Sequence, residues 1–147
     1  MVVNTKIRAR GEGPEHKIQR QLIAYLKIRG WTVEVMHGNA FQIGIPDLYL
    51  FRLDHGPRWV DCKNPKKYVF TKAQKLKWPY WDHVGIGIWI LTAATQKEYD
   101  KLFGPPNWRD YWRESWALPS QEDLDTMLEN LCAEGEEDYE GVEGDWY

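Results

Sequence analysis

The chain has 147 residues, 43% of them hydrophobic and 28% charged, which fits one domain and excludes wholesale disorder. It holds no run of about 18 uncharged apolar residues, so the sequence predicts no membrane-spanning helix, and its first residues lack the apolar segment of a secretory signal. Only two cysteines are present, Cys62 and Cys132, which excludes a disulfide framework and favours the reducing cytoplasm.

The net charge of −3 is unevenly distributed along the chain. Residues 1–81 contain 15 Lys and Arg against 6 Asp and Glu, or +9, whereas residues 82–147 contain 4 against 16, or −12. A basic first half favours a polyanionic partner. A chance imbalance between solvated faces explains the same numbers, so charge alone does not decide between the two interpretations.

The first predicted elements are a helix and three strands. We expect residues 1–12 to form a mobile basic arm ahead of a helix that begins at Pro14, because proline is favoured in the first turn of a helix. The helix ends at Gly30 and presents an apolar stripe formed by Ile18, Leu22, Tyr25 and Leu26. Residues 37–40 are rich in turn formers, and residues 54–57 predict a tight connection between the second and third strands. The three strands are predicted at 31–36, 45–51 and 58–63.

Two helices and a strand are predicted next. The segment Thr71-Lys-Ala-Gln74 has the pattern of a capping box, which opens a short helix that we expect Pro79 to end. Residues 86–91 predict a central strand, and a second capping box at Thr95 opens a helix that Gly104 closes. Helix, three strands, helix, strand and helix together predict an α/β sandwich.

Composition divides the chain into three parts. Residues 1–104 hold the predicted α/β core, and residues 105–133 form a Trp-rich helical extension with a helix predicted over 120–133. Residues 134–147 hold seven acidic residues and no basic one, and we expect this tail to be disordered.

Candidate chemistry lies on two neighbouring predicted strands. Strand periodicity puts Asp61 and Lys63 on one face. Asp47 lies opposite or diagonal to Asp61 if the strands pair through a turn near Asp54, because positions 47 and 61 are equally distant from 54. Two carboxylates this close repel each other unless a divalent cation lies between them, and oxygen ligands favour Mg²⁺ or Mn²⁺ over zinc. Such a metal with two acids and a lysine suits phosphodiester hydrolysis, whereas an ordinary charged edge strand explains the same D-x-K pattern.

Glu15 lies on the apolar side of the first predicted helix, in register with Ile18 and Leu22. An unpaired carboxylate is costly in that position. Glu15 either complements the positive end of the helix dipole or supplies a third metal ligand, and the sequence leaves both interpretations open.

Four motifs occur in a fixed order: Glu15, Gly44-Ile-Pro-Asp47-Leu, Asp61-Cys-Lys63 and Thr71-Lys-Ala-Gln74. This set resembles the VRR-NUC branch of the PD-(D/E)XK nuclease superfamily. That branch has a Glu in its first helix, a G-x-P-D-L turn into a strand, an E-x-K strand and a following helix with S/T-x-x-Q. The resemblance covers residues 10–95. Asp61 departs from the usual Glu, although Asp occurs at this position elsewhere in the superfamily.

The resemblance implies a restriction-endonuclease-like α-β-β-β-α-β sandwich with a C-terminal helical extension. It also implies a Mg²⁺-dependent endonuclease that hydrolyses DNA, with Mn²⁺ able to replace Mg²⁺, and some members of the family act on branched DNA. The implied metal ligands are Glu15, Asp47, Asp61 and the backbone carbonyl of Cys62. Lys63 would orient or activate the attacking water, and Gln74 would brace the site or contact phosphate. Standalone domains of this type are frequent in phages, which act in the host cytoplasm, and often form homodimers.

Basic and aromatic residues near these motifs are candidate DNA contacts. Residues 64–67 form either a phosphate-contacting loop or a solvated turn. Trp78, Tyr80 and Trp81 either stack on bases or pack in the core. The candidate nucleic-acid-binding residues are Lys66, Lys67, Lys72 and Lys75.

Three functions of different classes are compatible with the sequence. The first is the metal-dependent endonuclease. The alternative is a catalytically inactive nucleic-acid-binding module on the same scaffold, and the third is a protein-interaction module that works through the Trp-rich, acidic C-terminal part. The presence of Glu15, Asp47, Asp61 and Lys63 together favours the enzyme, because a binding-only domain has no need of all four.

Overall fold

The computed structural model describes residues 13–36, 43–126 and 129. The elements, in chain order, are α2 (Pro14–Ile28), β1 (Thr32–Val35), β2 (Leu48–Arg52), β3 (Gly56–Cys62), α3 (Lys72–His83), β4 (Ile88–Leu91), α4 (Gln96–Asp100), and the 3-10 helices η1 (Lys101–Phe103) and η2 (Trp108–Tyr111). No helix of these residues is both long enough and apolar enough to span a membrane.

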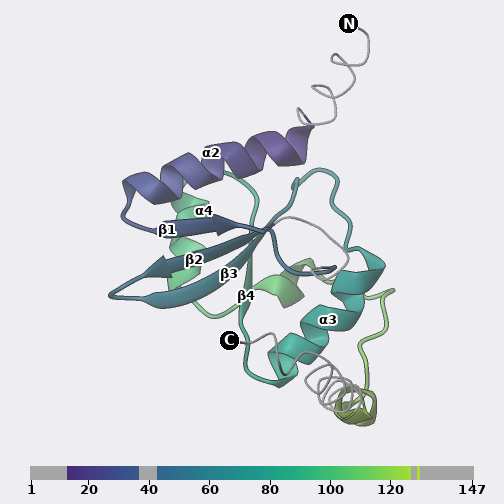
Figure 1. The fold of residues 1–147 in the computed structure, drawn as a ribbon. Helices are drawn as coiled ribbons and strands as arrows, with labels where there is room; N and C mark the ends of the chain where they lie inside the picture. The colour runs from purple at the N-terminus through teal and green to yellow at the C-terminus, as the bar shows by residue number, and fades with distance from the viewer. Residues whose placement is uncertain (1–12, 37–42, 127–128, 130–147) are drawn as a thin grey trace, which may run out of the picture.

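A mixed sheet of four strands in the order β1-β2-β3-β4 forms the centre of the fold (Figure 1). β1, β2 and β3 pair in antiparallel fashion, and β3 pairs with β4 in parallel. A turn over residues 53–55 joins β2 to β3 and leads into Gly56, whose φ of 80° suits glycine. The predicted α/β class is therefore confirmed, although β3 begins two residues earlier than predicted.

Helices cover both faces of the sheet (Figure 1). On one face, α2 and α4 pack with the strands around Leu22, Leu26, Leu48, Leu50, Val60, Cys62 and Tyr99. On the other face, α3 and η2 enclose a core of Phe70, Trp78, Ile88, Ile90 and Trp108. Because side chains alternate along β3, Val60 and Cys62 face α2, whereas Asp61 faces the α3 side together with Lys63, which follows the strand. This division between the two faces is the one that the sequence predicts.

Pro79 lies inside α3 and does not end the helix, contrary to the prediction from sequence. Proline in a helix interior removes one backbone hydrogen bond and costs about 3 kcal/mol. The helix continues to His83 because the residues around the proline are held by tertiary contacts. Pro79 and Trp78 are buried, and Trp81 packs edge-on against Trp59, with ring centroids 5.2 Å apart. Tertiary packing here outweighs the tendency of proline to end a helix.

The second predicted capping box forms only in part. Thr95 accepts a hydrogen bond from the Glu98 backbone N–H at 3.3 Å and so caps α4. The Glu98 carboxylate instead accepts from the backbone N–H and the hydroxyl of Thr92, at 2.9 and 2.8 Å, and pairs with Lys101. Glu98 thus ties α4 to the end of β4, a long-range role that a local pattern does not reveal.

The Trp-rich extension packs against the α3 side of the sheet. Trp108 is buried, and the rings of Trp112 and Trp116 lie 5.8 and 5.0 Å from that of Phe70. Residues 121–126 are helical, in agreement with the start of the predicted helix. The expected basic arm, the turn at residues 37–40, the end of this helix and the acidic tail lie outside the described residues.

Candidate metal centre

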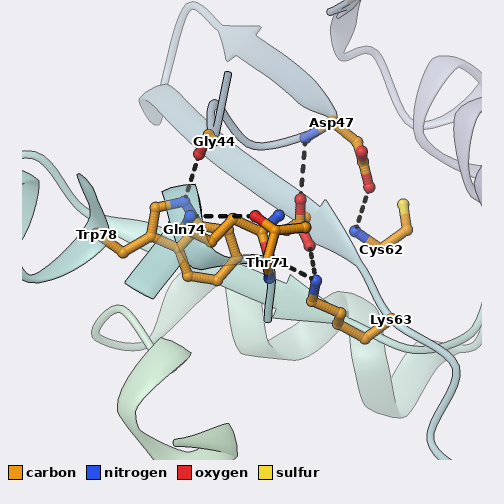
Figure 2. A network of polar contacts seen from close by, with 8 residues as sticks. Gly44, Asp47, Cys62, Lys63, Thr71, Gln74 and Trp78 are labelled. Carbon is orange, nitrogen blue, oxygen red and sulfur yellow. Dashed lines mark hydrogen bonds and ion pairs between the residues drawn. The ribbon is translucent and has the colours of Figure 1, made fainter. Parts of the chain in front are cut away.

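The β2–β3 hairpin places two carboxylates side by side. Its register pairs Leu48 with Val60, so one step further along the hairpin brings Asp47 opposite Asp61. The Asp47 backbone N–H donates to Asp61 Oδ1 at 3.2 Å, and the Cys62 N–H donates to Asp47 Oδ2 at 2.9 Å (Figure 2). The predicted opposition of Asp47 and Asp61 is therefore confirmed, and both carboxylates are anchored by the backbone of the partner strand.

Glu15 joins these carboxylates from the first turn of α2. One carboxylate oxygen of each of Glu15, Asp47 and Asp61 lies within 4.8 Å of the other two. Asp61 is only 1% exposed, Asp47 is half-buried and Glu15 is exposed, so the cluster reaches solvent on the side of α2. Glu15 thus occupies the position of a dipole partner and that of a metal ligand together.

Burial controls the protonation of the cluster. It raises the pKa of Asp61 to about 8, and the neighbouring Asp47 carboxylate acts in the same direction, whereas Lys63 opposes them. Burial also raises the pKa of Asp47, and partial loss of hydration around its carboxylate raises the pKa of Glu15, although the residue as a whole is exposed. At neutral pH the cluster without a cation therefore favours holding a proton at Asp61, because three close carboxylates in a poorly hydrated place cannot all ionise at low cost.

Lys63 is the cation of the site and is only 3% exposed. Its ammonium lies 2.9 Å from Asp61 Oδ2 and donates to Gln74 Oε1 at 3.0 Å (Figure 2). The rings of Phe70 and Trp78 lie 5.1 and 5.5 Å from Lys63 Nζ. The ammonium is thus held between oxygen atoms on one side and aromatic rings on the other, which fixes a side chain that is otherwise flexible.

The capping box of α3 positions Gln74. The Thr71 hydroxyl accepts from the Gln74 backbone N–H at 3.1 Å, and Gln74 Oε1 accepts from the Thr71 N–H at 3.0 Å. The same Oε1 accepts from Lys63. A motif that begins a helix therefore also orients the lysine, and Gln74 braces the site through that contact.

Trp78 has a role beyond stacking or packing, the two roles that the sequence predicts, because it connects α3 to the loop that carries Asp47. Its indole N–H donates to the Gly44 carbonyl at 2.8 Å (Figure 2). Gly44 has a φ of 81°, and a Cβ there would lie 3.0 Å from the Ala73 carbonyl group, so the close approach requires glycine. The spacing of four residues between Gln74 and Trp78, which places both on one helix face, is the sequence signal for this role.

The predicted nucleic-acid-binding lysines lie along the connection from β3 into α3. Lys66 and Lys67 are exposed in a turn in which Asn64 Oδ1 accepts from the Lys66 N–H at 3.1 Å. Lys72 is exposed in the first turn of α3, and the Lys75 ammonium lies over the ring of Trp116. These four lysines therefore follow Lys63 in the chain, in the turn after β3 and in the first part of α3. Cys62, by contrast, is buried in the core on the α2 side, and burial raises the pKa of its thiol.

The donor set fits a hard divalent cation. Mg²⁺ binds carboxylate oxygens at about 2.0–2.1 Å, so two oxygens on opposite sides of one ion lie about 4.2 Å apart. The three oxygens here lie within 4.8 Å of one another, which small side-chain adjustments bring to that distance. Asp61 Oδ2 is buried and receives no hydrogen bond of acceptable geometry from the described residues, even though Lys63 forms an ion pair with it. Such an oxygen has capacity left for a metal.

Comparisons of the chain with protein-family models, with curated proteins and with solved structures find no match. The residues of the site and the motifs that contribute them are therefore the features that indicate a function.

Proposed function

We propose that the protein is a metal-dependent endonuclease that hydrolyses DNA phosphodiester bonds on a restriction-endonuclease-like fold. The observation that supports this most is the convergence of Glu15, Asp47 and Asp61 within 4.8 Å, with the Lys63 ammonium 2.9 Å from Asp61. These residues come from α2, from the loop directly before β2 and from the end of β3, so the cluster does not follow from local sequence alone. Three carboxylates and an ordered lysine suit phosphodiester hydrolysis.

Each residue has a distinct part in this proposal. Glu15, Asp47, Asp61 and the backbone carbonyl of Cys62 would hold Mg²⁺ or Mn²⁺. The bound cation would polarise the scissile phosphate and increase the acidity of water. Lys63, held in place by Gln74, would donate hydrogen bonds to the attacking water or to a phosphate oxygen as negative charge develops.

One observation favours the alternative of a nucleic-acid-binding module without catalysis. Asp61 is one methylene shorter than the Glu usual in the resembling family, and it is almost fully buried beside Lys63. A shorter, buried carboxylate reaches a cation less easily, and a module that only binds DNA would tolerate this change. The basic residues along the β3–α3 connection serve either function equally.

A cleavage assay separates the two proposals. Labelled linear, branched and single-stranded DNA would be incubated with the protein in Mg²⁺, in Mn²⁺ and in EDTA. We expect cleavage in either metal and none in EDTA. Asp47→Asn should abolish cleavage, whereas Asp110→Asn, the same change at an exposed residue of η2, should retain it. DNA binding without cleavage of any substrate would favour the alternative.

A further inference from the structure

Two positively charged side chains lie over the ring of Trp116, in the Trp-rich extension. Lys75 Nζ lies 4.4 Å from the centroid of the Trp116 ring, and the Arg113 guanidinium carbon lies 5.7 Å from it. Arg113 also lies over the ring of Tyr68, at 5.1 Å, and donates to the Tyr68 carbonyl at 3.2 Å. One cation thus comes from α3 and the other from the extension, and both contact the ring of Trp116.

These cations have no carboxylate partner among the described residues: no ion pair joins Lys75 or Arg113 to an acidic side chain there. Residues 62–81 contain six lysines and no acidic residue. Among the neighbouring acids, Asp82 pairs with Arg109, and Glu114 is exposed next to Arg113. Positive charges held near one another repel, and a bound polyanion removes that repulsion.

Two aromatic rings connect this cationic group to Lys63 of the candidate metal centre. The ring of Tyr68 lies 6.3 Å from that of Phe70, which lies 5.1 Å from Lys63 Nζ. The turn that carries Lys66 and Lys67 lies between Lys63 and Tyr68 in the chain. We call the four residues Lys66, Lys67, Lys75 and Arg113 the basic strip.

We propose that the basic strip binds the phosphodiester backbone of DNA beside the cleavage site, and that the extension supplies Arg113 to this interface. The choice of DNA as partner rests on the proposed function. A guanidinium stacked on a ring keeps a fixed, planar fork of N–H donors, so little side-chain entropy is lost when it contacts phosphate. Phosphate contacts of this kind position a duplex without reading its sequence.

The test is a measurement of duplex DNA binding across a salt series. Fluorescence anisotropy with a labelled duplex of about 20 base pairs in EDTA would compare the full-length chain with Arg113→Gln. We expect the variant to bind several-fold more weakly at about 0.1 M salt, with a salt slope smaller by about 1. Lys97→Gln removes the same charge from an exposed position of α4, on the opposite face of the sheet, and should bind as the parent does.

Two further measurements distinguish DNA binding by the basic strip from a folding defect and from binding of an acidic protein. Thermal melting would show whether Arg113→Gln still folds; if it does not, Lys75→Gln on α3 should lower the salt slope in its place. Polyglutamate should compete with DNA only weakly, and equally strong competition would show that the strip binds an acidic protein segment instead, which overturns the proposal.

The proposal is also overturned if the parent chain does not bind duplex DNA, if Arg113→Gln leaves affinity and salt slope unchanged, or if Lys97→Gln weakens binding as much. Its failure is distinguishable from failure of the proposed nuclease. Binding that depends on Arg113, without any cleavage, supports the basic strip and contradicts the enzyme. Cleavage that is insensitive to Arg113 does the reverse.

Discussion

The Asp61 carboxylate is subject to three opposing influences. Burial and the neighbouring Asp47 carboxylate favour its neutral form, whereas the Lys63 ammonium favours the ionised form. Burial and Asp47 prevail, which is why the pKa of Asp61 rises to about 8. A divalent cation would reverse this balance, since it adds more positive charge than the single ammonium. The site is therefore better suited to a bound cation than to three ionised carboxylates alone.

This balance predicts that stability depends on pH when metal is absent. Because the pKa of Asp61 is raised from its ordinary value of 3.8 to about 8, its protonated form stabilises the fold below pH 4, and this stabilisation is lost as the pH rises through 8. Thermal melts in EDTA should therefore show lower stability at pH 8.5 than at pH 6. Asp61→Asn should weaken the dependence, and Mg²⁺ should restore stability at high pH. Identical pH profiles for parent and variant would contradict this account.

A substitution at Lys63 tests whether DNA cleavage and DNA binding depend on different residues. Lys63→Met keeps a side chain that fits between Phe70 and Trp78 but removes the charge. We expect cleavage to fall by at least about 100-fold, because a donor to developing charge is lost. DNA affinity should stay within a few-fold, since in our proposal the exposed lysines, and not Lys63, supply most of the phosphate contacts. Lys97→Met provides the control, and cleavage by Lys63→Met at the parental rate would refute the assignment.

A substitution at Glu15 distinguishes its role as a metal ligand from its role as a partner of the helix dipole. If its carboxylate binds the cation, Glu15→Gln should raise the Mg²⁺ concentration required for cleavage, with little change in melting temperature. If it only complements the α2 dipole, the variant should lose at most about 1 kcal/mol of stability and keep the parental Mg²⁺ requirement. Metal titration beside thermal melting decides between the two outcomes.

At the scale of elements, the parts predicted well are those with local causes. The β2–β3 hairpin and the position of Asp47 opposite Asp61 follow from strand periodicity and a turn centred on residue 54. The capping box at Thr71 also forms as predicted. The position of Pro79 inside α3 could not be predicted from local sequence. The contacts that keep it there come from β3 and from the core between α3, η2 and the sheet.

The contacts of the candidate site and of the basic strip that the sequence did not reveal are long-range. The hydrogen bond from Trp78 to Gly44 spans 34 residues, and the contact of Arg113 with Tyr68 spans 45. Arg113 is also difficult to identify from sequence as a basic contact, because residues 82–147 carry a net charge of −12. Composition of a segment does not indicate which of its few basic residues folds back onto a basic surface.

Trp78 allows a test of how α3 positions the loop that carries Asp47. Trp78→Phe keeps a ring beside Lys63 but loses the N–H that holds the Gly44 carbonyl, so the loop that carries Asp47 should loosen. We expect a loss of about 1–3 kcal/mol in the free energy of unfolding. We also expect weaker Mg²⁺ binding by isothermal titration calorimetry.

The control is Trp108→Phe, which removes an indole N–H that donates to Asp82 at 3.4 Å from the same core. This variant should also lose stability but bind Mg²⁺ as the parent does. Equal effects of the two variants on Mg²⁺ binding would show that Trp78 has only a structural role.

At the scale of the whole molecule, the two faces of the sheet carry different sets of residues. The α2 and α4 face holds an apolar core, and among the described residues the first turn of α2 contributes Glu15 to the candidate metal centre. The opposite face carries Lys63, Gln74 and the basic strip. The extension completes the core on that face, so its aromatic residues both stabilise α3 and place Arg113. The nucleic-acid binding that we propose would therefore depend on the same packing that stabilises this side of the protein.

The acidic tail provides the last prediction, because residues 134–147 carry seven acids and no base, against +9 for residues 1–81. An anionic segment attached to the chain competes with phosphate at high effective concentration. Deleting the tail should tighten DNA binding at low salt and steepen its salt slope, with the difference fading above about 0.3 M as screening increases. A tail with its seven acids changed to Gln and Asn separates charge from length and should behave like the deletion. Equal affinities for all three proteins across the salt series would instead identify a tail that only increases solubility.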